Sequence, residues 1–148
     1  IYNKCSFLKN PKEVIKMKLL IVENEFENRL RALQAFKLED GFEVVLVDNK
    51  KDAEKAINDK KIQAALISLF IPEKEGQEPD IKYGKDFAAT LDEKEISYVL
   101  LFSCGTKCLI YLDLLWFQRD MATTITLPRS TKECWEQALE ILKIKERI

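Results

Sequence analysis

Apolar and polar positions follow two different periods along this chain. Five short, strongly apolar runs are separated by segments in which apolar residues recur every three or four positions. Runs of the first kind predict β-strands, and segments of the second kind predict amphipathic helices. Strands that alternate with helices favour βαβ units and a parallel sheet. The five predicted strands are Lys18–Val22, Phe42–Val47, Ile62–Phe70, Ile96–Phe102 and Thr123–Leu127.

Four of the predicted helices have an apolar stripe that we expect to face the sheet. In the first helix the stripe consists of Phe26, Leu30 and Leu33, followed by Phe36 or Lys37. The whole pattern is that of a (βα)5 chain, with no internal repeat or linker. The other three stripes are Ala53, Ala56 and Ile57; Phe87, Ala88 and Leu91; and Trp135, Ala138, Leu139 and Leu142.

The fourth predicted helix, at about 106–118, has apolar residues around its whole circumference. A helix that lies on a sheet normally keeps one polar side, so the apolar outer side needs a cover. Either a partner subunit covers it, or the segment 73–83 or the N-terminal extension folds over it. Partner contact is favoured, because large exposed apolar patches are uncommon on monomers and 73–83 is highly charged. The candidate contact residues are Leu112, Leu115, Trp116 and Phe117, with Trp116 as the anchor.

Composition narrows the choice of partners and compartments. The 148 residues have the size of one domain, and 24 Lys and Arg nearly balance 25 Asp and Glu. This balance does not indicate a nucleic-acid partner. The longest nearly apolar run, Ile62–Ile71, is far shorter than the ~20 residues that a membrane-spanning helix needs. We therefore expect no membrane partner and a cytoplasmic protein.

The four cysteines are too few and too scattered for a disulfide scaffold, and the chain contains no histidine. Cys104 and Cys108 have no second cysteine pair that would complete a zinc site. Without histidine, the usual general base and the commonest metal ligand are missing. We expect free thiols, no metal centre, no cofactor and no enzymatic activity.

Residues 1–16 are interpreted as an extension that precedes a domain at 17–148. Lys12-Glu13-Val14 fits codons that contain a ribosome-binding sequence, and Met17 follows at a suitable distance. The extension is then a translated leader. Because the chain starts with Ile1, it is alternatively part of a longer reading frame.

Several short motifs occur in an order and at a spacing that together resemble one family. These are MKLLIVENE at the first strand, LISLFIP at the third, Gly84 at the third helix, VLLFS at the fourth strand and TITLP at the fifth. From Met17 to Lys143 the chain resembles the receiver domain of two-component response regulators. The resemblance implies a flavodoxin-like (βα)5 three-layer sandwich with a five-stranded parallel sheet.

The resemblance also implies a degenerate phosphorylation site. Glu23 and Asn24 stand where receivers have an acidic pair that binds Mg²⁺, and Ser68 stands where they have the phospho-accepting aspartate. Ser103 matches the hydroxyl that contacts the phosphoryl group, and Leu127 replaces a lysine. A serine cannot form the acyl phosphate of a receiver, and one remaining carboxylate is a poor Mg²⁺ site. We expect neither phosphotransfer nor tight metal binding.

These expectations lead to a stand-alone pseudo-receiver in signalling, which acts as a phosphorylation-independent protein-interaction module. The expected partner is a protein, and a homodimer through the face of the fourth helix, fifth strand and fifth helix is the simplest assembly. The alternative is a small-molecule or divalent-metal binder that uses Glu23, Glu25, Ser68 and Ser103. The long segment 73–83 either covers the strand-end crevice or presents a binding surface.

Overall fold

The computed structural model describes residues 17–36, 41–104, 107–112, 123–125 and 131–146, so the N-terminal extension, 1–16, lies outside the described residues. Within these ranges, no helix has both the length and the apolar character to span a membrane. The described elements, in chain order, are β1 (Met17–Val22), α1 (Phe26–Phe36), β2 (Phe42–Val47), α2 (Lys50–Asp59), β3 (Ala64–Ser68), α3 (Ile81–Glu93), β4 (Ser97–Cys104), β5 (Lys107–Leu112), β6 (Thr123–Ile125) and α4 (Lys132–Glu146).

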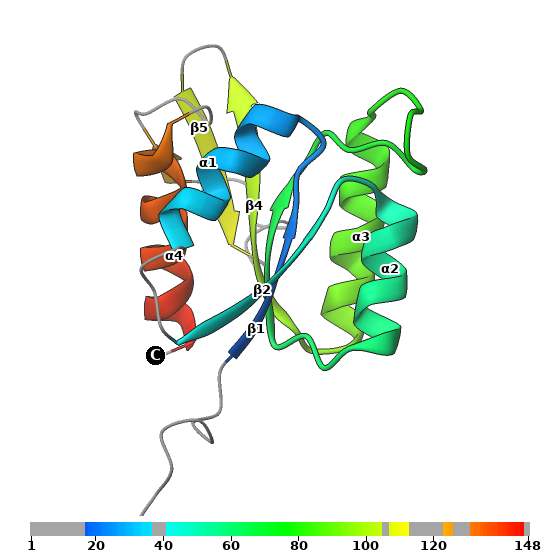
Figure 1. The fold of residues 1–148 in the computed structure, drawn as a ribbon, viewed down its shortest axis with the longest axis horizontal. Helices are drawn as coiled ribbons and strands as arrows, with labels where there is room; N and C mark the ends of the chain where they lie inside the picture. Colours follow the sequence, from blue (N-terminus) through cyan, green and yellow to red (C-terminus); the bar gives the residue numbers. More distant parts are fainter. Residues whose placement is uncertain (1–16, 37–40, 105–106, 113–122, 126–130, 147–148) are drawn as a thin grey trace, which may run out of the picture.

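The strands form a sheet between two layers of helices. Its strand order is β2-β1-β3-β4-β5-β6, and the pairs among the first four strands in this order are parallel. Helices α1 and α4 cover one face, and α2 and α3 cover the other (Figure 1). The predicted α/β three-layer sandwich is therefore confirmed. The strand order reverses direction between β1 and β3, and open α/β sheets usually bind ligands at the carboxyl ends of such strands.

The predicted fourth helix is wrong over Lys107–Leu112, which form the strand β5 instead. This strand pairs antiparallel with β4, and the paired ends Cys104 and Lys107 are separated by only two residues. Such a short connection is typical of a β-hairpin. A run that is apolar on every side fits a strand covered on both faces as well as a buried helix, so periodicity could not distinguish them.

The fifth predicted strand, Thr123–Leu127, is found as β6 over Thr123–Ile125, and the rest of it lies outside the described residues. β6 pairs antiparallel with β5, not with β4. Two antiparallel steps give β6 the direction of the first four strands. The sheet therefore departs from five parallel strands by the insertion of β5 between β4 and β6.

Alternate residues of the central strands face two separate cores. On β1, Leu19 and Ile21 pack toward α1 and α4, whereas Leu20 and Val22 pack toward α2 and α3. All four are fully buried, as expected of a strand with helices on both sides. The predicted inward stripes of α2, α3 and the last helix are confirmed, because all their members are buried.

The predicted inward stripe of α1 is confirmed only at Phe36, which is buried. Its other members are wrong, since Phe26, Leu30 and Leu33 are 64%, 42% and 46% exposed. Besides Phe36, the helix buries Asn28, Ala32 and Ala35. Ala32 and Ala35 share a core with the fully buried Trp135 of α4. Because the large indole fills this space, small side chains let α1 approach the sheet closely, and the larger apolar residues face outward.

The start of α3 lies against the end of β3. The Asp80 side chain caps this helix, since its Oδ1 accepts a hydrogen bond from the backbone N–H of Lys82 at 2.9 Å. In the first turn, a Cβ added to Gly84 would lie 2.1 Å from the carbonyl oxygen of Leu69. A backbone atom cannot rotate away from such a contact. Glycine is therefore required for α3 to approach the residue that follows Ser68.

Replacing Gly84 with alanine should lower the free energy of unfolding by about 1–3 kcal/mol, the usual cost of overpacking. The better helix propensity of alanine, worth about 1 kcal/mol, opposes this effect but does not remove the clash. Gly41→Ala is the matched control, because an added Cβ there meets nothing within 4 Å. Urea denaturation measures both variants, and equal stabilities would contradict the close approach.

Tyr98 on β4 is a fully buried tyrosine with an acidic neighbour. Its hydroxyl donates a hydrogen bond to Asp92 Oδ1 at 3.0 Å. Burial, followed by this hydrogen bond and the charge of Asp92, raises the pKa of the Tyr98 phenol well above its ordinary value of 10.0. The folded protein therefore holds the phenolic proton more tightly than the unfolded chain does.

This raised pKa predicts a loss of stability at alkaline pH. The contribution of Tyr98 is fully present below the unfolded-state pKa of about 10, and it decreases as the pH rises from there toward the folded-state pKa. In the Tyr98→Phe variant the alkaline decline should be shallower, although the variant should be less stable at pH 7. Urea denaturation between pH 7 and the alkaline range tests this, and parallel curves for the two proteins would rule it out.

Candidate functional site

Glu23 and Ser68 meet at the carboxyl ends of two adjacent parallel strands. Ser68 is the last residue of β3, and Glu23 directly follows β1. The register pairs Val22 with Ile67, so the next residue on each strand lies beside the other. Both side chains are fully buried. Two of the residues expected at the degenerate phosphorylation site are thus brought together.

The Ser68 hydroxyl donates a hydrogen bond directly to Glu23 Oε1. The other carboxylate oxygen, Oε2, accepts the backbone N–H of Glu25 at 3.0 Å. A buried carboxylate is costly unless donors compensate for the lost water. Here a neutral hydroxyl and a backbone amide supply these donors. Both carboxylate oxygens are therefore engaged by the protein itself.

The next two residues, Asn24 and Glu25, do not form a second carboxylate beside Glu23. Glu25 precedes α1, and its Oε1 accepts a hydrogen bond from Asn28 Nδ2 at 2.8 Å. The carboxylate of Glu25 thus bonds to the first turn of the helix, while Asn24 provides a neutral amide where receivers have a second acid. The pair of carboxylates that Mg²⁺ favours is not assembled by these residues.

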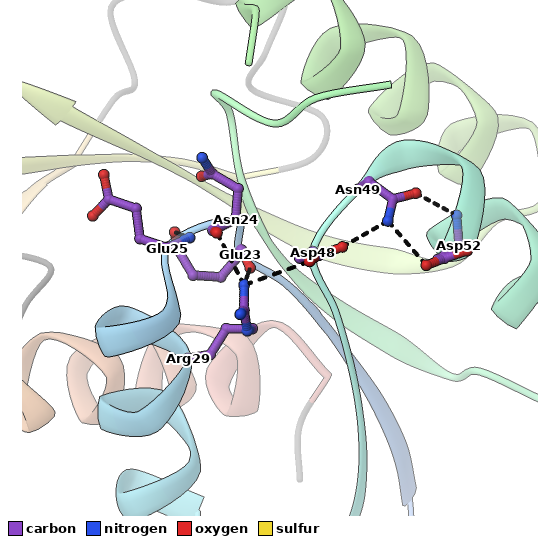
Figure 2. A network of polar contacts seen from close by, with 7 residues as sticks. All are labelled: Glu23, Asn24, Glu25, Arg29, Asp48, Asn49 and Asp52. Carbon is purple, nitrogen blue, oxygen red and sulfur yellow. Dashed lines mark hydrogen bonds and ion pairs between the residues drawn. The ribbon is translucent and has the colours of Figure 1, made fainter. Parts of the chain in front are cut away.

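Arg29 on α1 ties the ends of β1 and β2 together (Figure 2). Its Nη1 donates hydrogen bonds to the carbonyl oxygens of Glu23 and Asn24, each at 2.9 Å. The same nitrogen lies 3.9 Å from Oδ2 of Asp48, which follows β2. This role of Arg29 was not predictable from the sequence, because backbone acceptors leave no signature there.

Asn49 continues this network into α2 (Figure 2). Its Nδ2 donates to Asp48 Oδ1 at 2.6 Å and to Asp52 Oδ2 at 2.9 Å. Its Oδ1 accepts the backbone N–H of Asp52 at 2.8 Å and so caps the helix. An asparagine three residues before an acid at a helix start is a readable capping signal. This part of the network could therefore be predicted from the sequence.

Of the other predicted site residues, the structure describes only some. Ser103 lies near the carboxyl end of β4, two residues beyond Leu101, which pairs with Ser68. Leu112 is the last residue of β5 rather than part of a helix. Leu115, Trp116, Phe117 and Leu127 lie outside the described residues.

A polar cavity of about 260 Å³ opens at this edge of the sheet, but Glu23 and Ser68 do not line it. Within the ranges that the structure describes, no group of three acidic or cysteine residues is arranged to hold a metal ion. Among the described residues that line the cavity, one cation lies beside three acids, so their charges partly cancel. Its lining residues are Arg29, Leu46, Val47, Asp48, Asp52 and Glu75.

The segment after β3 runs along the start of α2. The backbone N–H groups of the first two residues of α2 donate to the carbonyl oxygens of Pro72 and Glu73, at 3.0 and 2.9 Å. The backbone N–H of Asp80 donates to Ile71 at 3.0 Å and closes the loop. Within this loop, Glu75 reaches the polar cavity. The loop thus borders the β2 side of the strand-end edge.

Neither a protein-family model nor a curated protein sequence matches the chain. Solved structures do match it. The signal receiver domain of a LuxO repressor protein from Vibrio parahaemolyticus aligns with a TM-score of 0.59 and 13% identity, over 90% of this chain and 94% of that one. The isolated REC domain of RcsB from Salmonella enterica serovar Typhimurium aligns with a TM-score of 0.50 and 10% identity, over 61% and 64%.

The RcsB response regulator from Salmonella typhimurium also aligns, with a TM-score of 0.50 and 8% identity. The alignment spans 63% of this chain and 45% of that longer one. At these identities the matches establish the fold. The chain therefore has the fold of response-regulator receiver domains, as the sequence motifs predicted.

The Ser68 hydroxyl should be needed to compensate the buried Glu23 carboxylate. Replacing Ser68 with alanine leaves Oε1 without this donor, so the free energy of unfolding should fall by about 1–3 kcal/mol. Thr90→Ala is the control, because its hydroxyl bonds to the exposed Asp86 carbonyl at 3.2 Å. Urea denaturation compares the variants. A Ser68→Ala protein as stable as the control would show that the bond contributes nothing.

Proposed function

We propose that this protein is a receiver-like signalling module that binds a protein partner without being phosphorylated. The buried hydrogen bond between Ser68 and Glu23 carries the proposal. It occupies the position where the resemblance puts the phospho-accepting aspartate and its metal-binding neighbour. An interaction module of this kind needs no cofactor and catalyses no reaction.

Phosphoryl transfer to Ser68 is opposed by both access and charge. The side chain is fully buried, so a phosphoryl donor cannot approach its oxygen in the folded protein. Its hydroxyl already donates a hydrogen bond to Glu23. A phosphoryl group here would also add about −1.5 to −2 charges beside a buried carboxylate. With no metal ion between them, this repulsion would be strong.

Divalent-metal binding has little support from the same residues. Mg²⁺ prefers oxygen ligands that include one or two carboxylates. Glu23 offers its oxygens to Ser68 and to the Glu25 backbone, and the Glu25 side chain accepts from Asn28. A metal ion would have to compete with these donors for the same oxygens. Regulation by an occupied metal site is therefore not part of the proposal.

The partner surface that we propose is still the apolar group Leu112, Leu115, Trp116 and Phe117. Leu112 ends a strand, so an apolar helix face no longer supports this surface. The support that is left is the concentration of large apolar residues, with a tryptophan among them, in one short segment. Aromatic residues of this kind dominate the binding energy of many interfaces. We place this module in the cytoplasm, where two-component receivers act.

Affinity capture with and without acetyl phosphate and Mg²⁺ tests the proposal. The wild-type protein should take up no phosphate, as read by intact mass, while a conventional receiver domain labelled in parallel does. The captured proteins should be the same under both conditions. Trp116→Ala should reduce capture at least tenfold, or about 1.4 kcal/mol, and Phe70→Ala, which alters another exposed aromatic, should not. Stoichiometric labelling, or capture that requires acetyl phosphate, would refute phosphorylation independence.

A further inference from the structure

The outer surface of α1 carries an apolar stripe in contact with solvent. Phe26, Leu30 and Leu33 lie at spacings of four and three residues, which aligns them on one face of the helix. We call these three residues the α1 stripe. Its members are the large apolar residues that the helix turns away from the core. Contiguous exposed patches of this kind usually mark a binding surface.

A groove lies beside the carboxyl-terminal half of the α1 stripe. It has a volume of about 340 Å³ and is formed between α1 and the edge strand β2. We call it the α1–β2 groove. The stripe thus has a projecting aromatic ring at one end and an apolar hollow at the other. The groove is lined by Leu30, Leu33, Gln34, Phe36 and Val44.

We propose that a second copy of this chain covers the stripe, by an antiparallel pairing of α1 with α1 about a two-fold axis. Phe26 precedes the Leu33–Gln34 part of the groove by seven to eight residues, or about 11 Å along the helix. An antiparallel pair with its axis near Leu30 places Phe26 of each copy over the groove of the other. A two-fold axis makes both contacts at once, because such an interface is self-complementary.

The polar residues beside the stripe favour the same orientation. Glu27 and Gln34 are exposed and lie seven residues apart, so they share one side of the helix. In the antiparallel pair, the Glu27 carboxylate of one copy faces the Gln34 amide of the other and accepts its N–H. A parallel two-fold pair would instead place the two Glu27 side chains on opposite flanks of the interface, so neither would meet a Gln34 amide. The complementary pairing occurs twice across the axis.

Arg29 links this surface to the strand-end network. Its guanidinium carbon lies 5.7 Å from the centroid of the Phe26 ring, which is within the range of a cation–π contact. The same guanidinium is bonded to the carbonyl oxygens of Glu23 and Asn24. The ring is thereby held against a group that is itself fixed. A fixed ring loses less conformational entropy when it enters the groove of a second copy.

Analytical ultracentrifugation of the full chain over a range of concentrations tests this assembly. The wild-type protein should be a reversible dimer. Leu30→Glu should weaken the dimer at least a hundredfold, because it places two carboxylates beside the axis, and Phe26→Ser should weaken it as well. Both positions are exposed in the single chain, so the folded domain should persist. Phe70→Glu is the matched control, since it adds the same charge at another exposed aromatic, and it should leave the dimer intact.

A second pair of variants tests the orientation. Gln34→Lys should tighten the dimer by on the order of fivefold, since Glu27 then faces an ammonium group in each half of the interface. Glu27→Lys alone should weaken it, and the double variant Glu27→Lys with Gln34→Glu should restore it. A wild-type protein that is monomeric at every concentration would overturn the proposal. A dimer that persists unchanged in Leu30→Glu would overturn it as well. A dimer that Trp116→Ala abolishes and the α1 variants do not would also overturn it. None of these outcomes bears on the phosphorylation-independent function, because labelling and affinity capture test that function separately.

Discussion

The buried hydrogen bond from Ser68 to Glu23 is the constraint on which the strand-end edge depends. Glu23 lies where water cannot reach it, and a carboxylate in such a place must be met by donors. The adjacent parallel strands β1 and β3 bring a hydroxyl to one oxygen, and the turn into α1 brings a backbone N–H to the other. Both oxygens of the buried carboxylate thus have hydrogen-bond donors that the protein itself supplies.

Beyond this bond, the polar residues at the edge hold the secondary structure together. Arg29 bridges the end of β1 and the acid that follows β2, and Asn49 joins that acid to the cap of α2. Charged and amide groups that would suit a reactive site here satisfy one another. The same arginine supports the exposed ring of Phe26. The interior of the edge and the outer face of α1 are therefore connected through one side chain.

Much of this arrangement could be read from the sequence, and the exceptions have physical causes. The central strands were predictable because strands buried on both faces are apolar throughout, and the meeting of Glu23 and Ser68 followed from their parallel strand ends. The inward face of α1 was not predictable. Trp135 lies about a hundred residues later in the sequence but packs in the same core, and its size explains why Ala32 and Ala35 face the core and Leu30 does not. Lys107–Leu112 was wrongly predicted to be helical because its five consecutive apolar residues fit either element. The bonds of Arg29 go to backbone carbonyls, which any residue provides.

The inserted strand β5 separates β6 from the site in a way that point changes cannot reverse. Neighbouring strands lie about 4.8 Å apart, so three spacings put β6 about 14 Å across the sheet from β3, where direct pairing with β4 would put it about 10 Å away. A cation carried at the end of β6 would stand one strand too far from Ser68. Because a whole strand lies between them, no point substitution would bring the end of β6 closer to Ser68, and only removal of the β4–β5 hairpin connection would.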